Sequence, residues 1–77
     1  MEITVIFDPT LSRYCHTGSN KVTIDFPEGT TIQQVLDHFK IIPGEVGIIL
    51  LNAQLANNET ILKDKDVLQL FQVFGGG

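Results

Sequence analysis

One segment with helical periodicity lies in the middle of a chain whose other regular segments have the pattern of β-strands. Its apolar side chains have the spacing of one helix face: Ile32, Val35, Leu36 and Phe39. Thr30 and Thr31 precede this face, each with a glutamine three residues later, as in a capping box. Pro43-Gly44 is predicted to end the helix shortly after Lys40. A helix with one apolar face has to bury it, and here only a sheet can cover it.

Five other segments have the composition or the alternation of strands. Ile3 to Phe7 is rich in β-branched and aromatic residues. Lys21 to Phe26 alternates apolar and polar side chains, which predicts a strand with one buried face. Val46 to Leu51 is a largely continuous apolar run, which predicts a strand buried on both faces. A short irregular strand is expected around Leu55, and Val67 to Phe74 is predicted to form the last strand.

This order of elements predicts an α+β protein with the β-grasp arrangement. We expect a mixed sheet of four to five strands with one helix packed across it. The first and last strands should lie parallel and adjacent at the centre, because the helix supplies the crossover that parallel pairing requires. Residues 1–74 should form a single domain, followed by a flexible glycine tail at residues 75–77.

Composition restricts the classes of partner and compartment. The 77 residues include 43% apolar side chains, which is enough for one packed domain. The single cysteine, Cys15, excludes an internal disulfide and fits a reducing compartment. The net charge of −4 argues against nucleic acid or an anionic membrane as the main partner, since both attract clusters of Lys and Arg. The sequence has no secretory signal and no apolar run of membrane length, so we expect a cytoplasmic protein.

The sequence closes with Gly75-Gly76-Gly77, directly after the last apolar segment. Glycine loses the most entropy when it is ordered, so three in a row are not expected to assist folding. A thin tail of this kind suits insertion into the narrow active site of another protein, where the carboxylate of Gly77 can be reached. The alternative is a frayed end without a function, since chain termini are often disordered.

The alternation of the last strand assigns its side chains to two faces. Leu68 and Leu70 should face the helix. Phe71 and Val73 should lie on the open face, as an apolar patch beside the tail, and such patches mark partner surfaces. Together with Phe74, which directly precedes the glycines, they are the predicted partner-binding residues. The alternative is that Phe71 packs under a loop.

The remaining reactive side chains do not suggest a catalytic or metal site. Cys15-His16 is the one reactive-looking pair, but a metal site takes three or four ligands and only His38 remains to join them. A histidine-activated thiol is the functional alternative to a plain loop cysteine. We interpret His38 as a favourable charge near the helix end and Tyr14 as an anchor for its loop. Asp64 and Asp66 are interpreted as turn residues.

The element order and the ending of the chain resemble the sulfur carriers of the ThiS/MoaD type, which are bacterial relatives of ubiquitin. Leu70-Phe71-Gln72-Val73, followed by one apolar residue and the glycines, is similar to the thiamine carrier ThiS. Leu50-Leu51-Asn52 resembles the family's Leu-Asn-Gly-type turn, with Ala53 where glycine is usual. Phe26-Pro27-Glu28-Gly29-Thr30-Thr31 and the long connection from Asp8 to Asn20 are more similar to MoaD, the small subunit of molybdopterin synthase.

The resemblance implies a protein co-substrate rather than an enzyme. In this family an ATP-using activating enzyme of the ThiF/MoeB type adenylates the carboxylate of the terminal glycine, and sulfur then replaces AMP to give a thiocarboxylate. Carried over, the reacting carboxylate belongs to Gly77, and Gly75 and Gly76 form the tail that reaches the enzyme. The resemblance also implies a downstream partner, either thiazole synthase or the large subunit of molybdopterin synthase, and no bound cofactor.

Two other classes of function stay open on the sequence. A ubiquitin-like modifier would use the same adenylate but would be joined through Gly77 to lysine side chains of other proteins. A non-catalytic β-grasp interaction module would act through its surface alone, and its glycines would be incidental. Within the carrier class, thiamine thiazole and molybdopterin biosynthesis both stay open, because the tail resembles one carrier and the front half resembles the other.

Overall fold

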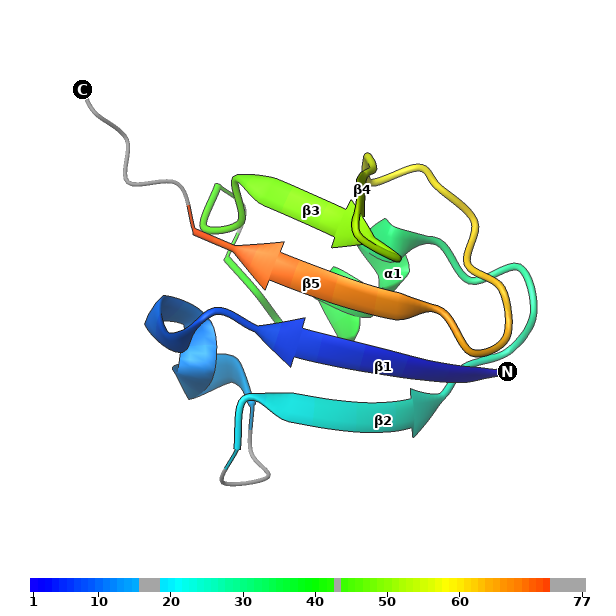
Figure 1. Ribbon diagram of the computed structural model, residues 1–77, viewed down its shortest axis with the longest axis horizontal. Helices are drawn as coiled ribbons and strands as arrows, with labels where there is room; N and C mark the ends of the chain where they lie inside the picture. Colours follow the sequence, from blue (N-terminus) through cyan, green and yellow to red (C-terminus); the bar gives the residue numbers. More distant parts are fainter. Residues whose placement is uncertain (16–18, 43, 73–77) are drawn as a thin grey trace.

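A computed structural model describes residues 1–15, 19–42 and 44–72 of the chain (Figure 1). Its elements in chain order are β1 (Glu2–Phe7), the 3-10 helix η1 (Pro9–Tyr14), β2 (Lys21–Asp25), α1 (Ile32–His38), β3 (Ile48–Leu51), β4 (Gln54–Leu55) and β5 (Val67–Phe71). The five strands form one sheet in the order β2-β1-β5-β3-β4. Helix α1 lies behind this sheet in Figure 1, and no helix covers the face toward the viewer. This is the predicted β-grasp architecture.

The two central strands come from opposite ends of the sequence. β1 and β5 run parallel, with Thr4 beside Val67 and Phe7 beside Leu70. β2 is antiparallel to β1, and β3 is antiparallel to β5. The predicted parallel pairing at the centre of the sheet is therefore confirmed, with α1 in the connection that carries the chain back across the sheet.

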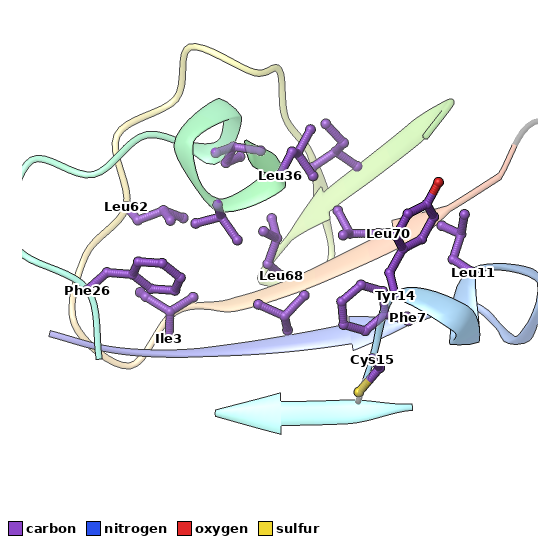
Figure 2. Packing of buried hydrophobic residues seen from close by; sticks show 14 residues of the cluster. Ile3, Phe7, Leu11, Tyr14, Cys15, Phe26, Leu36, Leu62, Leu68 and Leu70 are labelled. Carbon is purple, nitrogen blue, oxygen red and sulfur yellow. The ribbon is translucent and has the colours of Figure 1, made fainter. Parts of the chain in front are cut away.

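The apolar core lies between the sheet and α1 (Figure 2). The side chains with no exposed surface are Ile3, Val5, Leu11, Ile32, Val35, Leu68 and Leu70. Phe7 is also buried, and its ring packs edge-on against the ring of Phe39, with 5.1 Å between the centroids. The central strands thus contribute alternate residues to the core, and α1 contributes the face that its periodicity predicts.

Helix α1 begins with the predicted capping box, which Thr31 forms rather than Thr30. The Thr31 N–H donates to Oε1 of Gln34 at 2.9 Å, and the Gln34 N–H donates to Oγ1 of Thr31 at 3.3 Å. The N–H groups of Ile32 and Gln33, the first two of the helix, donate to the carbonyls of residues 60 and 58, at 3.0 and 2.9 Å. The start of the helix therefore has partners for the N–H groups that no helical turn can satisfy.

The end of α1 comes earlier than the sequence predicts. The last helical residue is His38, Phe39 caps the helix, and Lys40 takes a left-handed conformation with φ 57°. The Lys40 N–H donates to the Asp37 carbonyl at 3.0 Å, which is a tighter turn than an α-helix makes. The helix therefore ends at the turn formed by Phe39 and Lys40. Pro43, which was predicted to end it, lies outside the described residues.

The strand predicted over Val46 to Leu51 is shorter and less buried than expected. β3 begins at Ile48, which is 44% exposed, whereas Ile49 is 7% exposed. The prediction of burial on both faces is therefore wrong. One helix covers only one face of the sheet, so alternate residues of β3 lie on the uncovered face.

The connection after β1 contains the helix η1, whereas the sequence analysis predicts no regular structure there. Oδ2 of Asp8 caps it by accepting hydrogen bonds from the N–H and the hydroxyl of Thr10, at 3.2 and 2.5 Å. Leu11 and Tyr14 are buried, and the Tyr14 hydroxyl accepts a hydrogen bond from the Ile42 N–H at 3.3 Å. Tyr14 therefore anchors this connection to the core, as predicted, and also to the segment that precedes β3.

Asp66 does more than shape the turn in which the sequence places it. Its side chain is buried and accepts hydrogen bonds from the Asn52 side-chain amide at 2.9 Å and from the Lys63 N–H at 2.7 Å. Asn52 in turn accepts from the Val67 N–H at 2.9 Å and donates its own N–H to the Val67 carbonyl at 2.8 Å. This network joins the β3–β4 turn to the beginning of β5.

The β3–β4 turn has a backbone conformation that is unfavourable for the alanine at its second position. Asn52 and Ala53 both have positive φ, at 51° and 69°, which is the two-residue turn that prefers glycine at the second position. We predict that Ala53→Gly raises the free energy of unfolding by about 0.5–1 kcal/mol, because relief of left-handed strain exceeds the entropy that glycine adds to the unfolded chain. Urea denaturation measures this. Ala56→Gly, at a position without positive φ, is the control and should destabilise; equal destabilisation by both variants would contradict the prediction.

Candidate functional site

The predicted site lies at the end of β5, and the structure describes its first part. Five of the predicted site residues lie outside the described residues: Val73, Phe74, Gly75, Gly76 and Gly77. Phe71 is the last residue of β5, and Gln72 is the last residue that the structure describes. The geometry of the site is therefore that of the point where the chain leaves the sheet.

The two faces of β5 are those that its alternation predicts. Leu68 and Leu70 are fully buried and lie in the core beneath α1 (Figure 2). Val67, Gln69 and Phe71 are partly exposed, and strand geometry places them on the opposite face. The predicted register is therefore confirmed, while a role of Phe71 in partner binding stays a prediction.

Phe71 does not stand alone on the open face of the sheet. It pairs with Ile48 of β3, and Leu50 of the same strand pairs with Leu55 of β4. Residues opposite each other on neighbouring strands point to the same face, so these four side chains form what we call the open-face patch. Ile48 is 44% exposed and Leu55 is 81% exposed. This apolar group extends from the end of β5, at Phe71 and Ile48, to Leu50 and Leu55, and it fits a surface for a protein partner.

Three members of the open-face patch are not among the residues predicted from the sequence to bind a partner. Ile48 and Leu50 lie in the run that was predicted to be buried on both faces, and Leu55 lies in the short strand that was given no surface role. A signal was present, because a chain with one helix can cover only one face of its sheet. Applied to β3, that limit predicts that alternate apolar residues of the strand are exposed.

The end of β5 is held from both sides by backbone hydrogen bonds. On the β1 side, the Asp8 N–H donates to the Leu70 carbonyl at 2.9 Å. On the β3 side, the Gly47 N–H donates to the Phe71 carbonyl at 2.9 Å. The position from which the following residues extend is thus fixed by two neighbouring strands, although those residues themselves are not described.

The other side chains that could react, His38 and Cys15, take part in packing. His38, the last residue of α1, is exposed and packs edge-on against Phe26 and Phe39, with centroids 5.3 and 5.0 Å apart. Cys15 is buried at the end of η1, and its neighbour His16 lies outside the described residues. Within residues 1–15, 19–42 and 44–72, no three His, Cys, Asp or Glu side chains are grouped so that they could hold a metal ion. Over the same residues, no helix is long and apolar enough to cross a membrane.

The sequence matches the profile of the ThiS family over residues 12–77, which is most of the chain. The protein therefore belongs to the ThiS family of ThiS/MoaD-type sulfur carriers. Proteins of this family are small, are not themselves catalysts and bind no cofactor. The chain is accordingly not an enzyme. No curated protein matches the sequence closely enough to count as a relative.

Solved structures with the same fold include two archaeal proteins and one bacterial protein. A Pyrococcus furiosus protein described as molybdopterin converting factor subunit 1 superposes with a TM-score of 0.76 at 21% identity, covering 94% of this chain and 97% of that one. SAMP1 from Haloferax volcanii has a TM-score of 0.75 at 21% identity, with both chains fully covered. At these identities the two matches show the fold alone.

The bacterial structure adds an assembly to the comparison. It is a complex of subunits 1 and 2 of the molybdopterin-converting factor from Helicobacter pylori, with a TM-score of 0.61 and 27% identity over the full length of both chains. In that complex a protein of this fold is bound to a second subunit. The β-grasp architecture predicted from the sequence is thus shared with proteins of this kind.

The two faces of β5 predict losses of stability of different size for two neighbouring substitutions. Leu70→Ala should lower the free energy of unfolding by about 2–5 kcal/mol, because it empties a fully buried position. Phe71→Ala should cost clearly less, about 1 kcal/mol, because Phe71 lies at the surface of the open face. Urea denaturation of the two variants tests the assignment. A larger loss of stability for Phe71→Ala than for Leu70→Ala would show that Phe71, and not Leu70, faces the core.

Proposed function

We propose that this protein is a sulfur carrier whose Gly77 carboxylate is activated by a separate ATP-using enzyme of the ThiF/MoeB type. The carboxylate attacks the α-phosphate of ATP, which gives an acyl-adenylate and releases pyrophosphate. A sulfide-level sulfur nucleophile then displaces AMP, so that a carbon–sulfur bond replaces a carbon–oxygen bond and a thiocarboxylate forms. The carrier finally gives up this sulfur to a synthase in cofactor biosynthesis, in the cytoplasm.

The observation that carries this proposal is the family match over residues 12–77, which includes the three glycines. The chemistry needs a reachable carboxylate and an external source of activation, but no acid, base or nucleophile on the carrier. The predicted separation of the chain into a domain, residues 1–74, and a glycine tail, residues 75–77, fits this need. Glycine lets the backbone of a tail approach a partner closely, because it has no Cβ.

The activating enzyme is proposed to bind the open-face patch together with Val73 and Phe74. Phe71 and Ile48 lie at the end of β5 from which the tail extends, so an enzyme that covers them is placed beside the tail. Phenylalanine is enriched at protein interfaces, and a contiguous group of exposed apolar side chains marks a surface for a partner. Adjacent anchoring and reaction sites would allow one enzyme surface to hold the domain while its active site receives the glycines.

The synthase that accepts the sulfur is proposed to be thiazole synthase or the large subunit of molybdopterin synthase. The family is named for the thiamine carrier, and the Helicobacter pylori complex pairs a protein of this fold with the second subunit of a molybdopterin-converting factor. Pull-down of each synthase by the thiocarboxylated protein distinguishes the two acceptors. The synthase that binds the protein and, with its own substrate present, converts the thiocarboxylate back to the carboxylate identifies the pathway.

We predict that incubation with ATP and an activating enzyme of this class, in the presence of a sulfur source, converts the protein to a heavier species. The added mass should equal the difference between one sulfur and one oxygen atom, located at Gly77. Intact-mass and fragment-ion spectrometry measure both. Lysine-linked adducts in place of the thiocarboxylate would identify a modifier instead. An unchanged mass with every activating enzyme of the class would reject both roles and leave an interaction module.

Deletion of Gly76-Gly77 should separate the reaction from the fold. We predict that the shortened protein keeps its melting temperature, because glycines beyond the last strand bury little surface, and that it is no longer adenylated. Circular dichroism and ATP–pyrophosphate exchange measure the two properties. A marked loss of thermal stability would assign a structural role to the tail, and undiminished adenylation would place the reacting group elsewhere.

A further inference from the structure

A chain of side-chain contacts joins η1 to the end of β5 through Glu45. Nε2 of Gln72 donates to Oε2 of Glu45 at 3.0 Å, and the Arg13 guanidinium donates to the other oxygen of the same carboxylate. Both oxygens of Glu45 are therefore occupied, and its side chain is only 18% exposed. Gln72 directly follows β5, so this contact comes one residue after the backbone hydrogen bond between the Gly47 N–H and the Phe71 carbonyl.

Arg13 is itself held in place by its surroundings. Its guanidinium carbon lies 4.8 Å from the centre of the Tyr14 ring. The guanidinium N–H of Nη1 also donates to the Thr10 carbonyl at 3.3 Å. The hydrogen bond to Glu45 raises the pKa of Arg13 above its ordinary value. Since Tyr14 is buried in the core, the Glu45 carboxylate is tied to the domain and not to a freely rotating surface side chain.

The contacts bring together three segments that are distant in the sequence. η1 and the segment that precedes β3 lie at the same end of the sheet as the end of β5 (Figure 1). Arg13 belongs to η1, Glu45 belongs to the segment before β3, and Gln72 is the residue that follows β5. The Arg13 side chain is 54% exposed, and exposed ion pairs contribute little to global stability. The consequence of the network is therefore local: it holds Gln72, the residue that directly follows β5.

We propose that Glu45 is a positioning residue that fixes, through Gln72, the direction in which the chain leaves β5. This proposal rests on the proposed function, because direction matters when the residues that follow have to enter an enzyme's active site. A segment that is directed before binding loses less entropy when it is bound. Loss of the Glu45 contact should therefore raise the carrier concentration that adenylation requires, while the chemical step keeps its rate.

The first test uses the protein alone. In Glu45→Ala and in Gln72→Ala, the backbone order parameter at position 72 should fall below about 0.6, whereas in the wild type it should be near the rigid value of about 0.85. Glu2→Ala is the matched control, because it removes the ion pair with Lys65, 2.6 Å long, at the opposite end of the sheet. All three variants should melt within about 4 °C of the wild type. An unchanged order parameter in Glu45→Ala would overturn the proposal.

The second test uses adenylation kinetics with the activating enzyme. Glu45→Ala should raise the KM for the carrier about 3- to 10-fold with kcat nearly unchanged, as expected for one side chain that must be ordered on binding. The double variant Glu45→Ala, Gln72→Ala should be no worse than either single variant, because both changes remove the same contact. Additive effects, or a loss confined to kcat, would overturn the positioning role. If the wild type is not adenylated, the proposed function fails, and the order parameters still decide whether Glu45 holds Gln72.

Discussion

The parallel pairing of β1 with β5 is the contact on which the rest of this fold depends. It places residues 4–7 beside residues 67–70, so that everything between them serves to return the chain to the centre of the sheet. Backbone hydrogen bonds fix the pair at both ends, from the Thr4 N–H to the Asp66 carbonyl at 3.0 Å and from the Asp8 N–H to the Leu70 carbonyl at 2.9 Å. The segment after β5 therefore leaves from the middle of the sheet, where two neighbouring strands set its starting point.

A single helix over a five-stranded sheet leaves one face of that sheet uncovered. The alternation of β5 makes the two faces chemically different, with Leu70 fully buried and Phe71 on the open side. Pairing with β3 and β4 then adds further apolar side chains to the open side, of which Leu55 is 81% exposed. An apolar surface that is unfavourable in water thus extends from the end of β5 across β3 to β4, and a partner enzyme that receives the Gly77 carboxylate would bury it.

The end of β5 is also the place where distant parts of the chain meet. Tyr14 of η1 is buried in the core and holds the segment before β3 through its hydroxyl, while Glu45 of that segment reaches Gln72. The long connection after β1 thus supports the neighbourhood of the proposed site. A carrier whose chemistry is supplied by other enzymes needs this kind of support, because its own contribution is the presentation of a carboxylate.

Local pattern was sufficient for much of this protein. The order of elements, a capping box at Thr30 or Thr31, the inward positions of Leu68 and Leu70 and the family resemblance all follow from residues close together in the sequence, because capping and strand alternation are short-range effects. The exposure of Ile48, the helix η1, the buried carboxylate of Asp66 and the contact between Glu45 and Gln72 were not predicted. The exposure of Ile48 and the local Asp8 cap of η1 had signals in the sequence. The contacts of Asp66 and Glu45 depend on which distant segments the sheet brings together, and composition or spacing within one segment carries no information about such a neighbour.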